Sequence, residues 1–319
     1  MTTAAKPIDW TASDIPNLAG FDAIVTGANS GLGLVTATQL AAHGAHVTLA
    51  VRDTERGEFA AESIRTSSPG ATVEVSHLDL ASLTSVRQFT ELWIAAHPAG
   101  LNLLINNAGV MAIPRRESAD GFEMQLATNH LGHFALTGLL LPALITAGEP
   151  ERSRVVTVSS QAHRFGRMNF DDLQGERKYR AWGAYGQSKL ANLLFTNELN
   201  RRLRQADVPV SALAVHPGYA ATNLQSAAPR MKGSNRGEKI MGLANRVLAQ
   251  SAEMGALPTL YAATEPGLPG GLYVGPDGFG EQRGHPTVVG MSAAASNRAD
   301  ASRLWVASEE LTGVHYLNG

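Results

Sequence analysis

Residues 21–40 read FDAIVTGANSGLGLVTATQL, and this stretch decides the fold. Phe21 to Thr26 form a short apolar run typical of a buried strand, and the run stops at Gly27. From Leu34 to His43 the apolar residues recur at helical spacing, and Gly44 follows as a stop signal. A strand, a glycine-rich turn and a helix in this order predict a sheet that binds a ligand where its strands end.

The same alternation continues along the chain. Helical patterns over residues 82–96 and 121–147, and in the segment that contains Tyr185, separate further β-rich runs at residues 46–51, 72–77, 101–106, 154–159, 210–215 and 271–274. Near-continuous Val, Ile and Leu runs between helices indicate parallel strands that are buried on both faces. We therefore predict an α/β fold, a doubly wound parallel sheet of about seven strands with helices on both faces.

We predict one domain over residues 1–319, with residues 1–19 as an N-terminal extension. Residues 164–182, 224–238 and 274–286 are expected to be irregular. Residues 223–250 are predicted to form a lid on the substrate side, or alternatively an amphipathic helix packed on the body. The lid's apolar residues would be Met231, Ile240, Met241, Leu243 and Val247. Residues 251–319 are expected to complete the domain with a helix, a strand and a tail.

Composition excludes several classes of site. The 319 residues are 44% hydrophobic and 17% charged with a net charge of −2, so a sizeable core is expected and nucleic-acid binding is not. There is no cysteine, which removes disulfides, thiolate nucleophiles and cysteine zinc sites. The ten histidines show no metal-ligand spacing beyond His130 and His133, so no metal site is predicted.

No membrane segment is predicted either. The longest apolar stretch, residues 131–147, is short for a membrane span and contains His133 and Pro142. Residues 1–17 lack the apolar core of a signal peptide. We expect a buried helix at residues 131–147 and a cytoplasmic protein.

Two local motifs carry chemistry. The turn after the first strand contains Gly27, Asn29, Ser30, Gly31, Leu32 and Gly33, whose backbone N–H groups can cradle phosphate at a helix N-terminus. Tyr185 and Lys189 lie four residues apart, so on a helix they share one face. An ammonium group beside a phenol is expected to lower the pKa of the phenol towards neutral, which suits proton transfer to an oxygen.

These motifs, taken together in chain order, resemble the short-chain dehydrogenase/reductase family. The resemblance covers roughly residues 20–222 and rests on the T-G-x-x-x-G-x-G turn, Asp79, Asn106-Asn107-Ala108-Gly109, Asn129, Ser159-Ser160, Tyr185-x-x-x-Lys189 and Pro217-Gly218-x-x-x-Thr222. It implies a Rossmann fold and a nicotinamide cofactor. Asp79 would bind adenine with Leu80 beside it, Asn107, Ala108 and Gly109 would line the ribose, and Pro217, Gly218 and Thr222 would hold the nicotinamide end.

The resemblance also implies the catalytic roles. Tyr185 would be the general acid or base, and Lys189 would lower its pKa and hold the ribose. Ser160 would bind the substrate oxygen, with Ser159 and His163 structural, and Asn129 would interrupt its helix and hold a water next to Lys189. The second strand ends at Val51 and Arg52 follows, which favours NADP(H), because an arginine suits a 2′-phosphate. Because Asp53 would place a carboxylate near the ribose, NAD(H) remains the alternative cofactor.

Residues 161–184 form an insertion before Tyr185, which resembles the retinol-dehydrogenase-like branch, as do residues 52–57, 129–134 and 189–195. We predict hydride transfer to or from a moderately hydrophobic alcohol, aldehyde or ketone. The alternatives are an NAD-dependent dehydrogenase, other chemistry on the same fold such as dehydration or epimerisation, and a nucleotide-sensing or scaffold protein. A homodimer or homotetramer is plausible through the helices that hold Asn129 and Tyr185.

Overall fold

The computed structural model describes residues 9–148, 153–219 and 250–317. The strands are β1 (Asp22–Thr26), β2 (His46–Val51), β3 (Val73–His77), β4 (Leu103–Asn106), β5 (Arg154–Val158), β6 (Ser211–Val215), β7 (Tyr273–Pro276) and β8 (Pro286–Val288). They form one sheet in the order β3-β2-β1-β4-β5-β6-β7-β8, and every pair is parallel except β7 with β8. The predicted doubly wound sheet is confirmed.

The strand count differs from the prediction, because the sheet formed by the described residues has eight strands rather than about seven. The additional strand, β8, is only three residues long and follows the Gly- and Pro-rich stretch that was expected to be irregular. A short strand that begins with proline is typical of a sheet edge, where the missing N–H costs no ladder bond. Such a strand carries too little periodicity to be recognised in the sequence.

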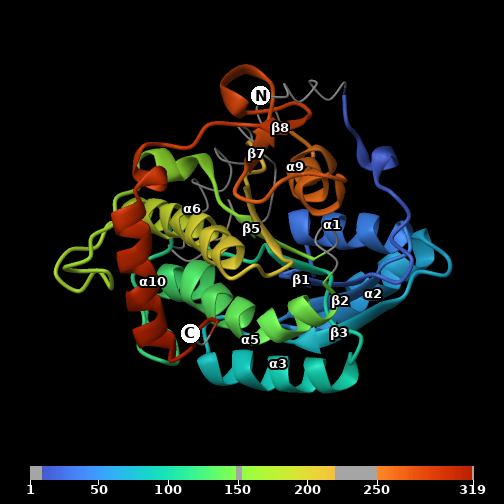
Figure 1. Cartoon of the computed structure of the whole chain (residues 1–319), viewed down its shortest axis with the longest axis horizontal. Helices are drawn as coiled ribbons and strands as arrows, with labels where there is room; N and C mark the ends of the chain where they lie inside the picture. Colours follow the sequence, from blue (N-terminus) through green and yellow to red (C-terminus); the bar gives the residue numbers. More distant parts are fainter. Residues whose placement is uncertain (1–8, 149–152, 220–249, 318–319) are drawn as a thin grey trace, which may run out of the picture.

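Helices cover both faces of the sheet. The long helices are α1 (Gly31–Ala42), α2 (Thr54–Ser67), α3 (Leu83–Ala96), α5 (Gly132–Thr146), α6 (Ala181–Gln205), α9 (Ala252–Thr264) and α10 (Arg298–Thr312). Figure 1 shows α1 and α9 on one side of the strands and α3 and α5 on the other. Val25 packs with the first group and its neighbour Ile24 with the second. This alternation is what buries a parallel strand on both faces.

The helix predicted over residues 121–147 is helical from Met124 to Thr146 but is not uniform. A short α4 (Met124–Leu126) leads into a π-helical turn (Ala127–Leu131), and α5 follows. The π-helical turn contains Asn129, so the expected interruption at this residue is present. Such turns are rare and are often found at functional sites. No helix in the three described ranges has both the length and the apolar character that crossing a bilayer requires.

Helix α10 lies over α5 and α6. Its Trp305 packs edge-on against Phe134 of α5 and stacks on Phe195 of α6. The resemblance placed a dimer interface on the helices that hold Asn129 and Tyr185, and α10 covers part of that surface within the same chain. The homodimer or homotetramer stays a prediction.

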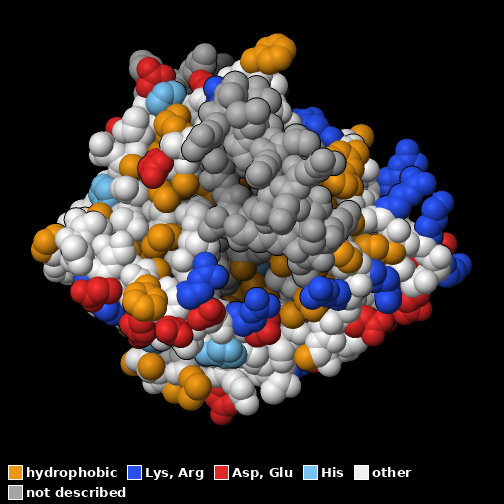
Figure 2. Space-filling view, turned by 180° about the vertical axis from the view of Figure 1, so that it is seen from behind, with side chains coloured by type: hydrophobic (Ala, Val, Ile, Leu, Met, Phe, Trp, Pro, Cys, Tyr) orange, Lys and Arg blue, Asp and Glu red, His pale blue; other side chains and the backbone are white. Residues whose placement is uncertain are grey.

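Charges of both signs are mixed on the surface. Figure 2 shows acidic and basic side chains next to one another along the lower half of the reverse face, with a further basic group at its right edge. This pattern differs from the continuous basic stripe that is typical of nucleic-acid-binding proteins.

Candidate active site

A cavity of about 1050 Å³ opens at the carboxyl ends of the central strands. Most of the predicted site residues line it, namely Gly27, Asn29, Ser30, Gly31, Leu32, Gly33, Arg52, Asp79, Leu80, Asn107, Ala108, Gly109, Ser160, Tyr185, Lys189, Pro217 and Gly218. Asn129 lies behind this lining. Thr222 and the predicted lid at residues 223–250 lie outside the described residues. The cavity therefore brings together the residues that the sequence placed at successive strand ends.

The turn between β1 and α1 has the form that a phosphate requires. Ser30 is the N-cap of α1, and its side chain makes no capping hydrogen bond, so the first N–H groups of the helix are left to a ligand. Gly27 has φ of +66°, a conformation that favours glycine. A Cβ on Gly33 would lie 2.5 Å from Asn107 Nδ2 and 2.6 Å from the Gly27 carbonyl oxygen. The residues of this turn thus fit a dinucleotide pyrophosphate.

Thr26 joins this turn to the end of β4. Its hydroxyl oxygen accepts hydrogen bonds from the backbone N–H groups of Asn107 and Ala108, each at 2.9 Å. Asn107 Nδ2 donates back to the Thr26 carbonyl at 2.8 Å. The Asn-Ala-Gly segment is therefore held against the phosphate turn by β1 itself, and the Asn107 side chain is used for this link.

His133 extends the link to Asn129, a contact that sequence reasoning missed. Its Nε2 lies 2.9 Å from the Thr26 hydroxyl and its Nδ1 lies 3.1 Å from the Asn129 carbonyl oxygen. Nδ1 must carry the proton, because a carbonyl only accepts, so Nε2 accepts the Thr26 hydroxyl proton. Burial lowers the pKa of His133 to about 3, which keeps the ring neutral as this arrangement requires. His133 thus ties the phosphate turn to the π-helical turn.

Two arginines, rather than one, lie at this end of the cavity. Arg52 follows β2 and Arg56 belongs to α2; the sequence used Arg56 only as part of the branch motif at residues 52–57 and gave it no role at the cofactor. Asp53, the acid that left NAD(H) open, is the N-cap of α2, and its Oδ1 accepts from the Arg56 N–H at 3.1 Å. One oxygen of this carboxylate is therefore engaged by the helix.

Tyr185 and Ser160 meet at the other end of the cavity. Tyr185 is 5% exposed, and the neighbouring Ser160 side chain acts to lower the pKa of its hydroxyl. Ser160 also caps a short 3₁₀ turn, in which its Oγ accepts from the Ala162 N–H at 3.1 Å. Ser159 points elsewhere, because its hydroxyl donates to the Lys189 carbonyl at 2.8 Å. The geometry therefore distinguishes the two serines.

Lys189 lies one helical turn after Tyr185, with its Nζ 5.9 Å from the centre of the tyrosine ring. The Nζ donates to the Val158 carbonyl at 3.0 Å, at the end of β5. A Cβ placed on Gly109 would lie 3.0 Å from Asn129 Oδ1 and 3.6 Å from the Lys189 Nζ, so these three residues are neighbours. Asn129 holds the Val110 backbone through both side-chain groups, at 2.8 and 2.9 Å.

The prediction that the pKa of Tyr185 falls towards neutral is wrong for this structure. Burial raises the pKa of Tyr185 to about 12, against the opposing effect of the Ser160 side chain. Burial also lowers the pKa of Lys189 to about 8. Sequence spacing places the two groups on one face of a helix but does not reveal how deeply they are buried, and here desolvation decides both directions.

The insertion at residues 161–184 forms one wall of the cavity. It contributes Phe165 and Trp182, whose side chains are 57% and 55% exposed, and Trp182 meets the Tyr185 ring edge-on at 6.0 Å. Met111, Ile113 and Met124 line the cavity from the segment before the π-helical turn. The wall beside Tyr185 is therefore largely apolar. Sequence reasoning did not place these residues at the site, since they come from loops and from the first residues of α4 and α6, where periodicity does not show which way a side chain faces.

A polar network anchors this insertion to the body. The buried Glu123 receives a 3.0 Å hydrogen bond from the Tyr179 hydroxyl, and its own N–H donates to Gln174 Oε1 at 2.7 Å. Gln125 Nε2 donates to the Tyr179 oxygen at 2.7 Å and to the Ala181 carbonyl at 3.0 Å. Burial raises the pKa of Glu123. These contacts fix the insertion directly before α6 begins.

A protein-family model and several curated proteins match this chain over most of its length. The family model for short chain dehydrogenases matches residues 22–233. Human retinol dehydrogenase 13 is 43% identical over 298 residues, which cover 92% of this chain and 85% of that protein. Human retinol dehydrogenase 11 is 41% identical over 297 residues, covering 93% and 87%.

Two solved structures also match most of this chain. A crystal structure of an uncharacterised protein from Mycobacterium paratuberculosis is 46% identical, with a TM-score of 0.78, and the match covers 97% of this chain and 100% of that chain. A crystal structure from Beutenbergia cavernae with NADP bound at low occupancy is 27% identical, with a TM-score of 0.58, covering 78% and 91%.

Proposed function

Because the chain belongs to the short-chain dehydrogenase/reductase family, in its retinol-dehydrogenase-like branch, it is an NAD(P)-dependent oxidoreductase that acts on CH–OH groups, and we propose its cofactor, substrate class and catalytic residues. The cofactor is NADP(H), and the substrate is a moderately hydrophobic alcohol/carbonyl pair. Tyr185 is the general acid in reduction and the general base in oxidation. The bound nicotinamide supplies or accepts the hydride.

The observation that carries this proposal is that Ser160, Tyr185 and Lys189 line the same cavity at its apolar end, with the Lys189 Nζ 5.9 Å from the centre of the Tyr185 ring. Ser160 binds the substrate oxygen and Tyr185 delivers the proton to it. The raised pKa of Tyr185 keeps the phenol protonated at neutral pH, which suits reduction. A charged Lys189 opposes the cost of the phenolate that forms as the proton leaves. Asn129, held by His133 and Val110, positions the π-helical turn beside Lys189.

An assay of carbonyl compounds of increasing length, followed by NADPH consumption, tests this function. The panel should include retinal, because relatives of this chain are called retinol dehydrogenases. Consumption of NADPH with an apolar aldehyde or ketone is expected. A nucleotide-sensing protein would instead bind NADPH tightly and leave the whole panel, and the matching alcohols with NADP, unchanged.

The preference for NADP(H) rests on Arg52, directly after β2, and Arg56, on the first turns of α2. A guanidinium is a suitable partner for a 2′-phosphate, and both Arg52 and Arg56 line the same cavity. Asp53 also lines this cavity, with one of its oxygens engaged in capping α2.

We predict that Arg52→Ala raises the KM for NADPH roughly 10- to 100-fold and changes the KM for NADH little, since only NADPH carries the phosphate. Steady-state kinetics with each cofactor measures both values. Arg204→Ala, on the last turn of α6, is the matched control and should behave as wild type. Equal losses for the two cofactors would rule out a phosphate contact.

We also predict that Trp182→Ala raises the KM for a long apolar aldehyde about 10-fold, because the exposed indole would be covered by the substrate. A two- or three-carbon carbonyl should be affected much less. Trp182→Phe keeps an apolar ring and is expected to retain most of the affinity. KM values that rise equally for long and short carbonyls would show that Trp182 does not contact the chain of the substrate.

A further inference from the structure

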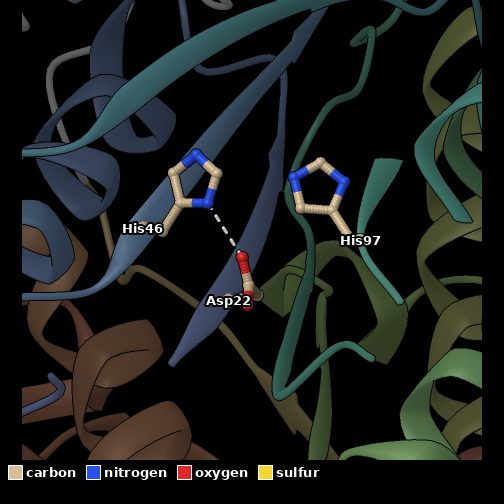
Figure 3. A group of neighbouring side chains, drawn as sticks. All are labelled: Asp22, His46 and His97. Atoms are coloured by element: carbon tan, nitrogen blue, oxygen red, sulfur yellow. Dashed lines mark hydrogen bonds and ion pairs between the residues drawn. The ribbon is translucent and has the colours of Figure 1, made fainter. Parts of the chain in front are cut away.

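Three potential metal ligands meet where the strands begin, at the end of the sheet opposite the cavity. Asp22 begins β1, His46 begins β2 and pairs with it in register, and His97 follows the last residue of α3. Figure 3 shows their side chains turned towards one another. One ligand atom from each lies within 4.8 Å of the other two. The two histidines are distant in the sequence, so spacing rules could not pair them.

The His97 ring is fixed with a free lone pair facing the cluster. Its Nδ1 lies 2.8 Å from the Trp93 carbonyl oxygen, so Nδ1 carries the proton, and the neutral ring presents an unprotonated Nε2. The ring also stacks on Trp93 at 4.1 Å with an interplanar angle of 7°. A backbone carbonyl that holds the second nitrogen of a histidine is a common support for a metal ligand.

A second carboxylate lies beside the group. Glu74 of β3 lies 3.5 Å from His97 Nε2 and 4.0 Å from His46 Nε2. The Thr48 hydroxyl donates to Glu74 at 2.6 Å and in turn accepts from the Trp93 indole at 2.9 Å. Asp22 contacts the other ring nitrogen of His46, Nδ1, at 2.9 Å. Two imidazoles and the Asp22 carboxylate therefore converge, and Glu74 lies next to them.

The donor set suits one class of ion. Two imidazole nitrogens with carboxylate oxygens favour Zn²⁺ and related transition metals over Mg²⁺ and Ca²⁺, which prefer oxygen ligands alone. Zinc–ligand bonds of about 2.1 Å place tetrahedral ligand atoms about 3.4 Å apart. The Asp22 and His46 ligand atoms lie 2.9 Å apart, and one atom from each of the three residues lies within 4.8 Å of the other two, so small side-chain movements reach that spacing. The three side chains are 10% to 31% exposed, so an ion can enter from solution.

We propose that His46, His97 and Asp22 bind one divalent ion of the zinc class, with Glu74 beside them. The ion would join β1 and β2 to the end of α3. It would lie about 16 Å from the cofactor turn, the length of the five residues of β1, and so it would stabilise the fold without entering the reaction. This site departs from the prediction that the chain binds no metal.

Isothermal titration of the purified protein with ZnCl₂ tests the site. Wild type is expected to take up one equivalent of Zn²⁺, and the double variant His46→Gln/His97→Gln should bind at least 10-fold more weakly. His315→Gln is the matched control, since His315 is an exposed histidine beside a single carboxylate, Glu309, and this variant should bind as wild type. Saturating Zn²⁺ should raise the Tm of wild type by about 3 °C or more and that of the double variant by less.

Two results would overturn the proposal. One is the absence of Zn²⁺ uptake by wild type, which would leave the cluster as a set of contacts between histidines and carboxylates only. The other is equal uptake by wild type and the double variant, which would place the ion elsewhere. Circular dichroism and NADPH binding by the double variant show that it is folded. If it is not, the single variants His46→Gln and His97→Gln are titrated, and each should lower the affinity for Zn²⁺.

Discussion

Tyr185→Phe is expected to lower the rate of hydride transfer roughly 10²- to 10⁴-fold, because the variant has no proton to give to the substrate oxygen. The ring fills the same buried position, so the Kd for NADPH should stay within about twofold of wild type. Single-turnover kinetics measures the rate, and fluorescence titration with NADPH measures the affinity. The raised pKa of Tyr185 means that the loss in carbonyl reduction should appear throughout the neutral pH range.

Tyr261→Phe is the matched control. Tyr261 belongs to α9 and packs edge-on against Trp10, away from the cavity lining, so losing its hydroxyl should not affect turnover. A Tyr185→Phe variant that kept wild-type activity would eliminate Tyr185 as the general acid. Loss of NADPH binding together with activity would point to a damaged fold.

Lys189→Met is expected to separate activity from stability. We predict a 10²- to 10³-fold loss of kcat, since the variant lacks the charge that favours the Tyr185 phenolate. The same change should leave the protein as stable as wild type or more so. The Val158 carbonyl keeps a hydrogen bond from Asn192 at 3.1 Å, so no buried acceptor is left without a partner.

The stability gain should depend on pH in a defined direction. Burial lowers the pKa of Lys189 from 10.5 to about 8, which corresponds to a cost of about 3 kcal/mol for the charged form in the folded state. Below pH 8 wild type bears this cost in full, and between pH 8 and 10.5 the unfolded chain binds a proton that the folded chain does not. Wild-type stability therefore rises across that window relative to Lys189→Met. Urea unfolding at several pH values tests this, and an advantage of the variant that grows with pH would contradict it.

Residues that act at strand ends could be predicted from the sequence. The phosphate turn, Asn107, Ser160 and Tyr185 follow successive buried strands or open the next helix, and the carboxyl ends of parallel strands meet at one edge. Their convergence therefore follows from the alternation of strands and helices. Their catalytic roles stay predictions that the variants above would test.

Other features of the site could not be predicted from the sequence, because they depend on contacts between distant residues. His133 was noted for its spacing to His130, as an interruption of an apolar stretch and as part of a branch motif, whereas its position depends on Thr26, which lies 107 residues earlier. The raised pKa of Tyr185 comes from the depth of the site and not from the local spacing to Lys189. Arg56 was part of a branch motif, but the sequence gave no sign that it lines the cavity. Burial and long-range contacts determine the roles of these residues, and neither can be read from a short stretch of sequence.

The anchoring of the insertion has a consequence for protein engineering. Gly166 leaves no room for a side chain, because a Cβ there would lie 2.2 Å from the Gly186 carbonyl oxygen, so the segment enters at a fixed point. Its far end is fixed by Tyr179, through Glu123 and Gln125. A segment held at both ends is a natural unit for exchange between homologues. Loop grafts that keep Gly166, Gln174 and Tyr179 could change which molecules are accepted while the proton-transfer groups keep their places.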